Sequence, residues 1–76
     1  MHERILIDPQ VHHGQPVIRG TRVPVVVILG GMAGGAPIDE IMREYDITEE
    51  DVRAALDYAA DLVEQQQVSP QPVPAP

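Results

Sequence analysis

A strong helix-start signal at Thr48 constrains the fold more than any other feature of the sequence. Thr48 can cap a helix, and Asp51 stands three residues later, where the acid of a capping box lies. Ile47 and Val52 occupy the positions at which apolar side chains pack together across such a start. Apolar residues then recur at helical spacing and predict one buried face. This face contains Val52, Ala55, Leu56, Ala59, Leu62 and Val63.

Two further helices are expected before this one. A proline at position 37 opens the first of them, acids fill its first turn, and apolar side chains recur as far as Tyr45. The short connection between Tyr45 and Thr48 predicts a tight helix–turn–helix. Residues 25–32 are ambiguous, because their β-branched side chains favour a strand whereas their apolar spacing favours a helix. We predict a short helix there, ended by a pair of glycines.

The N-terminal part of the chain is β-prone. Residues 5–7 (Ile-Leu-Ile) form a short strand that a proline turn stops, and residues 16–24 predict a tight hairpin with a proline at each end. Gly20 is expected as the first central residue of its turn, which places Arg19 opposite Arg22. Like charges so placed repel each other, so we expect an anionic group near the tip. The predicted fold is mainly α: a short N-terminal β element, strand plus hairpin, precedes a three-helix domain.

The chain is long enough for only one small domain. It has 76 residues, 43% of them hydrophobic, but no Phe or Trp, so aliphatic side chains must build the core. We expect this domain to span residues 1–64 and to be marginally stable by itself. Residues 65–76 contain four of the eight prolines and no charge, and are expected to form a flexible Pro/Gln-rich tail. Such a chain excludes a large self-contained enzyme and is typical of a small binding module.

Groups that could carry catalysis or hold a cofactor are sparse. The chain has no cysteine, which excludes a disulfide framework and fits a cytoplasmic location. Adjacent histidines at 12 and 13 lack a convincing third metal ligand. Asp57, Asp61 and Glu64 share a helix face and could ligate Mg²⁺, but a solvated acidic face is far commoner. We therefore expect no enzyme activity, no cofactor, no metal and no membrane-spanning segment.

Charge is distributed unevenly along the chain, and this bears on DNA binding. Residues 1–38 carry three arginines and two acids, a net +1, whereas residues 39–76 carry two arginines and ten acids, a net −8. A DNA-binding helix–turn–helix would insert the last helix, but acids fill its first turn and only Arg53 is basic on its exposed face. Arg19 and Arg22 are the alternative DNA contacts, acting as a wing on the phosphate backbone. Ion pairs with the protein's own acidic helices would explain these two arginines equally well.

Two stretches of the sequence resemble a known bacterial and archaeal family. Residues 14–25 read Gly-Gln-Pro-Val-Ile-Arg-Gly-Thr-Arg-Val-Pro-Val, a long and unusual string, and residues 38–59 look like the later part of the same pattern. The pattern is similar to domain-of-unknown-function family 433 over residues 4–63. The resemblance implies a homeodomain-like helix–turn–helix fold with a short β element before its three helices.

The same resemblance implies a role as a VapB-type antitoxin. Such antitoxins pair with a PIN-like ribonuclease toxin, mask its acidic metal site and bind their own promoter with it. The resemblance makes the Arg19-Gly20-Thr21-Arg22 motif the expected DNA-binding element, to which we add Arg53. The expected function is therefore the antitoxin of a type II toxin–antitoxin pair that neutralises its toxin and autorepresses its promoter. Two alternatives are a stand-alone homodimeric DNA-binding transcriptional regulator and a dimeric adaptor with no nucleic-acid role.

Protein partners are expected at the C-terminal end of the chain. The small core favours a homodimer, formed through the N-terminal strand or through the Tyr58 side of the last helix. The uncharged tail could order along a groove of the toxin or be an idle terminus. The expected partner-binding residues are Tyr58, Asp61, Leu62, Val68, Pro70 and Pro72.

Overall fold

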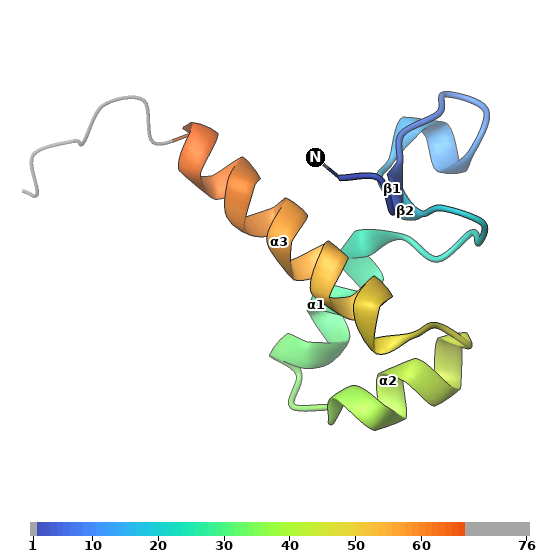
Figure 1. Ribbon diagram of the computed structural model, residues 1–76, viewed down its shortest axis with the longest axis vertical. Helices are drawn as coiled ribbons and strands as arrows, with labels where there is room; N and C mark the ends of the chain where they lie inside the picture. Colours follow the sequence, from blue (N-terminus) through green and yellow to red (C-terminus); the bar gives the residue numbers. More distant parts are fainter. Residues whose placement is uncertain (1, 67–76) are drawn as a thin grey trace, which may run out of the picture.

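The computed structural model describes residues 2–66 and contains three helices and one small antiparallel sheet (Figure 1). The fold is mainly helical with a short β element at the N-terminus, as the sequence predicts. In chain order the elements are β1 (Ile5–Leu6), the 3-10 turn η1 (His12–Gly14), β2 (Val17–Ile18), α1 (Val25–Ala33), α2 (Ile38–Tyr45) and α3 (Glu49–Gln66). No helix in this range is long and apolar enough to cross a bilayer.

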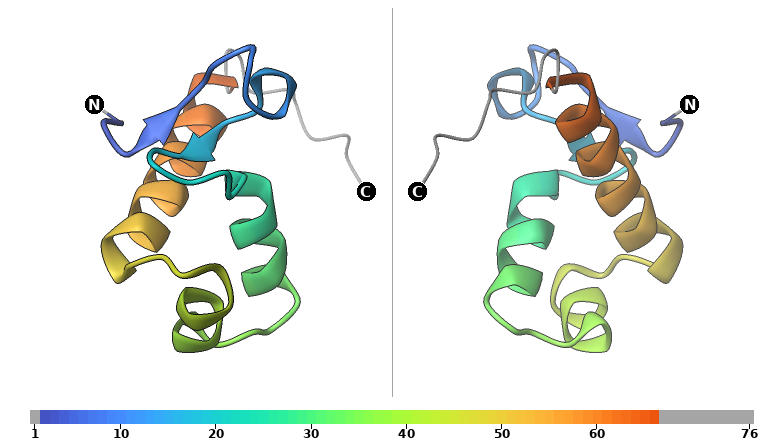
Figure 2. Two further views of the ribbon diagram at one scale, coloured as in Figure 1. Left: turned by 90° about the vertical axis from the view of Figure 1, so that its right-hand side faces the viewer. Right: turned by 90° about the vertical axis from the view of Figure 1, so that its left-hand side faces the viewer.

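The sheet pairs β2 with the N-terminal strand, which the expected hairpin does not include. Ile5 of β1 lies opposite Ile18 of β2, so the strand partner comes from the first residues of the chain. The expected hairpin leading to α1 is also present, since the Ile18 N–H donates to the Val23 carbonyl at 2.9 Å. β1 contacts α3, and α1 and α2 also pack against α3 (Figure 2).

The turn after β2 differs from the predicted one. The Thr21 N–H donates to the Ile18 carbonyl at 3.0 Å, so Gly20 is the second central residue of the turn, with a φ of 83°. The Arg19 N–H donates to the Arg4 carbonyl, so Arg19 and Arg22 do not bond to each other. The predicted register of the two arms is confirmed, because Val17 lies opposite Pro24 in an antiparallel bridge. The Thr21 hydroxyl also donates to the Ile18 carbonyl, at 2.8 Å, so both Thr21 donors close the turn one residue earlier than predicted.

The start of α3 confirms the capping-box prediction. The Asp51 N–H donates to the Thr48 hydroxyl at 3.1 Å, and the Thr48 N–H donates to the Asp51 carboxylate at 3.0 Å. Ile47 and Val52 are both buried beside this cap. Asp46 ends α2 in the left-handed conformation, with a φ of 53°, which turns the chain sharply into the next helix.

The core is aliphatic and involves both strands and all three helices. Its buried members are Ile5, Val17, Ile18, Val25, Ile28, Ile41, Ile47, Val52 and Ala55. The predicted apolar face of α3 is buried only at Val52 and Ala55, whereas Leu56 and Leu62 are 40% and 38% exposed and Val63 is 61% exposed. An 18-residue helix is about 27 Å long, whereas the nine-residue α1 beside it covers only about 14 Å. The C-terminal end of α3 therefore extends past α1 (Figure 1).

Candidate functional site

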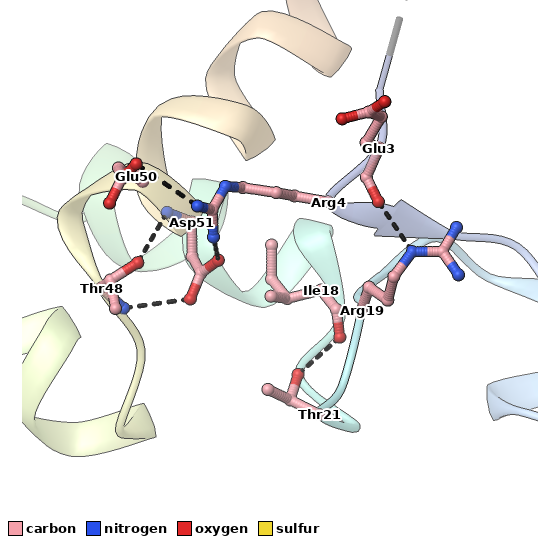
Figure 3. A network of polar contacts seen from close by, with 8 residues as sticks. All are labelled: Glu3, Arg4, Ile18, Arg19, Thr21, Thr48, Glu50 and Asp51. Carbon is pink, nitrogen blue, oxygen red and sulfur yellow. Dashed lines mark hydrogen bonds and ion pairs between the residues drawn. The ribbon is translucent and has the colours of Figure 1, made fainter.

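Arg4 reaches from the edge of β1 to the first turn of α3 (Figure 3). Its guanidinium lies 3.0 Å from an Asp51 carboxylate oxygen and 3.3 Å from one of Glu50. Asp51 is the one buried charged residue of the described range. Burial by itself raises the pKa of Asp51, but hydrogen bonds from Thr48 and the Arg4 guanidinium hold this pKa below its usual value of 3.8. Asp51 therefore carries a negative charge at neutral pH.

This arrangement changes the charge that the start of α3 presents. Glu50 and Asp51 are paired with Arg4, and Glu49 is paired with Arg53 at 3.1 Å along the helix. Three acids are thus opposed by two arginines, so the start of α3 is less repulsive to phosphate than its sequence indicates. Arg4 is a site residue that the sequence did not reveal, because its partners lie 46 and 47 positions away. No local pattern signals such a contact.

Arg19 and Arg22 lie on the exposed turn after β2. Among residues 2–66, no acidic side chain lies within ion-pair distance of either arginine. The Arg19 Nε donates instead to the Glu3 carbonyl at 2.7 Å, which holds that side chain against the N-terminal segment. Arg4 and Arg19 point to opposite sides of β1 (Figure 3). Of the two alternatives for this motif, ion pairing with the chain's own acidic helices is therefore not observed in the described range.

His2 attaches the N-terminus to the second half of α3. Its imidazole Nε2 lies 2.8 Å from the Asp61 carboxylate, and its Nδ1 lies 3.6 Å from that of Asp57. The ring also packs edge-on against Tyr58, with 5.3 Å between the ring centroids. Asp61, an expected partner-binding residue, is thus already in contact with His2.

An apolar groove of about 320 Å³ runs between α1 and α3. Tyr58 and Leu62, two expected partner-binding residues, contribute to its wall, whereas Asp61 does not. Val68, Pro70 and Pro72 lie outside the described residues. The groove is lined by Gln15, Pro16, Val25, Val26, Leu29, Tyr58, Ala59 and Leu62. Most of these lining side chains are aliphatic, and Gln15 is the one with a polar amide. The groove therefore suits an apolar contact.

Among known proteins similar to this chain, one is named as an antitoxin and another as a member of the DUF433 family. A protein of Mycobacterium tuberculosis (strain ATCC 25618 / H37Rv), named "Putative antitoxin VapB45", is 36% identical over 56 residues, which cover 74% of this chain and 23% of the relative. The chain therefore spans about a quarter of that relative's length. At the family level this similarity supports a toxin–antitoxin role.

Two crystal structures share the fold. A DUF433 member protein from Anabaena variabilis ATCC 29413 matches with a TM-score of 0.75 and 40% identity, over 82% of this chain and 62% of that one. Rv2018 from Mycobacterium tuberculosis matches with a TM-score of 0.63 and 35% identity, over 68% of this chain and 24% of that one. The profile of the family described as "Protein of unknown function (DUF433)" matches residues 5–59. The chain belongs to the DUF433 family.

Proposed function

We propose that this chain is the antitoxin of a type II toxin–antitoxin pair and that it binds and neutralises a PIN-like ribonuclease. The observation that carries the proposal is the 36% identity to a relative named as an antitoxin. The described residues also leave apolar side chains of α3 exposed, among them Leu62 and Val63. Such a surface fits a protein that binds another macromolecule, and the proposed antitoxin would act in the cytoplasm without catalysis.

The toxin-binding surface in this proposal is the second half of α3 with the residues that follow it. Leu62 and Val63 are exposed there, and Tyr58 lies one turn earlier. Asp61 and Glu64 place acids beside these apolar groups, so a toxin surface with apolar and basic side chains would be complementary. Val68, Pro70 and Pro72 would extend the contact along a groove of the toxin.

Promoter binding is proposed for the complex, through the turn after β2. Arg19 and Arg22 are exposed and lack acidic partners in the described range, so they are available to phosphate. Gly20 and Thr21 shape this turn, and Arg53 on α3 would supply a further contact once Glu49 releases it. The same arginines also favour the second candidate function, a stand-alone homodimeric regulator that binds DNA without a toxin.

Co-expression with the neighbouring open reading frame tests the proposal. We expect the two proteins to elute together in size-exclusion chromatography with light scattering, and the ribonuclease activity of the partner to disappear in the complex. A neighbour that is not a nuclease, or a mixture that still cleaves RNA, would remove the antitoxin proposal. Salt-sensitive DNA binding by the isolated chain, with no toxin present, would then favour the regulator.

A further inference from the structure

The outer face of α1 is apolar and uncovered. All nine residues of α1 are aliphatic, methionine or glycine, yet only Val25 and Ile28 are buried. Val26 is 62% exposed, the largest value for any large hydrophobic side chain in the described range. A helix that is apolar on all sides is normally covered on all sides. We define the outer face of α1 as Val26, Leu29, Gly30 and Ala33, and α1 itself lies at one edge of the molecule (Figure 2).

We propose that a second copy of this chain covers the outer face of α1. In a two-fold dimer, a charged side chain near the axis lies beside the same side chain of the second copy, and the two repel each other. A surface that binds its own copy therefore needs to be uncharged near the axis. The chain has a net charge of −7, and its acids lie mainly on α2 and α3. α1 has no acid in its first turn and no base in its last. A second copy can therefore approach α1 without like-charge repulsion, whereas a charged partner would find no complementary charge on this helix.

The shape of α1 also suits a copy of itself. Gly30 lies at the middle of the outer face, and a Cβ added there would meet nothing within 4 Å. An antiparallel crossing centred between Leu29 and Gly30 places Val26 of one copy opposite Ala33 of the second copy, and both residues belong to the outer face. The larger valine of each copy then packs against the small alanine of the other. Val26 and Leu29 also line the groove toward α3, which continues this apolar surface.

The proposed dimer contact meets the proposed toxin contact at the groove between α1 and α3, but each contact also has residues that the other lacks. Val26 on α1 and Val63 on α3 are equally exposed valines, at 62% and 61%, on two different helices. A charge at Val26 should therefore break self-association and leave toxin binding intact. A charge at Val63 should weaken toxin binding and leave self-association intact. The dimer proposal and the toxin proposal can therefore fail independently.

Light scattering and analytical ultracentrifugation of the full chain over a wide concentration range test the dimer. We expect a mass twice that of the 8.3 kDa chain at high concentration. Val26→Glu should weaken self-association about tenfold or more, because it buries a carboxylate beside its own copy. Ile7→Glu is the matched control, since Ile7 is 56% exposed but lies outside this face. Circular dichroism of each variant verifies that the monomer remains folded.

Cysteine cross-linking adds a test of the crossing point. The chain has no cysteine, so Gly30→Cys introduces a single thiol next to the proposed axis, and Ile7→Cys introduces one away from it. Oxidation should join the first variant into a disulfide dimer and leave the second unlinked. A chain that stays monomeric at every concentration would overturn the proposal. So would a dimer that survives Val26→Glu, or a toxin complex that Val26→Glu abolishes, because the face would then belong to another contact or another partner.

Discussion

Arg4 and Asp51 form an ion pair of 3.0 Å that joins the N-terminal β element to the first turn of α3. Asp51 is also the acid of the capping box that starts this helix. One carboxylate therefore links a local helix cap to a long-range contact. The orientation of β1 on α3 and the start of α3 should be energetically coupled for this reason.

Replacing Arg4 should destabilise the fold. Arg4→Ala leaves a buried carboxylate without its cationic partner, so we expect the free energy of unfolding to fall by about 1–2 kcal/mol. Arg53→Ala is the matched control, because the Arg53–Glu49 pair is exposed and its loss should cost no more than about 0.5 kcal/mol. Urea unfolding followed by circular dichroism measures both. Equal losses for the two variants would contradict a special role for Arg4.

Acid should weaken the fold through Asp51. Its pKa is lowered in the folded state, so ionised Asp51 stabilises the fold at pH values above its usual 3.8, and this contribution is lost as the pH falls through the lower folded-state pKa. The midpoint of urea unfolding should therefore decline below about pH 4. Asp51→Asn should be less stable at pH 7 and show a shallower decline in acid. A decline as steep as that of the wild type would assign the effect to other carboxylates.

Two glycines should respond oppositely to alanine. Gly20 has a φ of 83°, so Gly20→Ala forces a Cβ into the left-handed region and should cost about 1 kcal/mol of stability. Gly30 lies inside α1 with open space around it, so Gly30→Ala should stabilise the monomer by about 0.5–1 kcal/mol. Thermal unfolding at low protein concentration separates the two effects from self-association. Stabilisation by Gly20→Ala would show that the turn adopts another conformation in solution.

DNA binding should depend on the exposed arginines of the turn. Arg19→Ala and Arg22→Ala should each weaken binding to promoter DNA, and each should reduce the slope of log affinity against log salt by about one. Arg43→Ala is the control, because Arg43 is an exposed arginine on α2, outside this turn. Fluorescence anisotropy with promoter DNA at several salt concentrations provides the measurement. An unchanged salt slope in both turn variants would show that these arginines do not contact phosphate.

Local signals in the sequence predicted most of the secondary structure. The capping box at Thr48 and Asp51 forms between residues three positions apart, so its partners meet whenever the helix forms. The helix over residues 25–33 follows from apolar spacing despite its β-branched valines. The string at residues 14–25 indicates the family by its residues alone, and the match of the family profile to residues 5–59 confirms it.

The tertiary structure decided which residues far apart in the sequence contact each other and which apolar side chains stay exposed. Spacing along α3 marks which side chains are apolar, but a neighbouring element must cover them, and Val63 lies outside the groove between α1 and α3 and stays 61% exposed. The ion pair between Arg4 and Asp51 and the contact between His2 and Asp61 join residues 47 and 59 positions apart. Local propensity acts over a few residues, so the sequence by itself determined the helices and their caps. Contacts across the chain depend on how those elements pack, so only the folded domain decided which charges are paired and which apolar faces remain open.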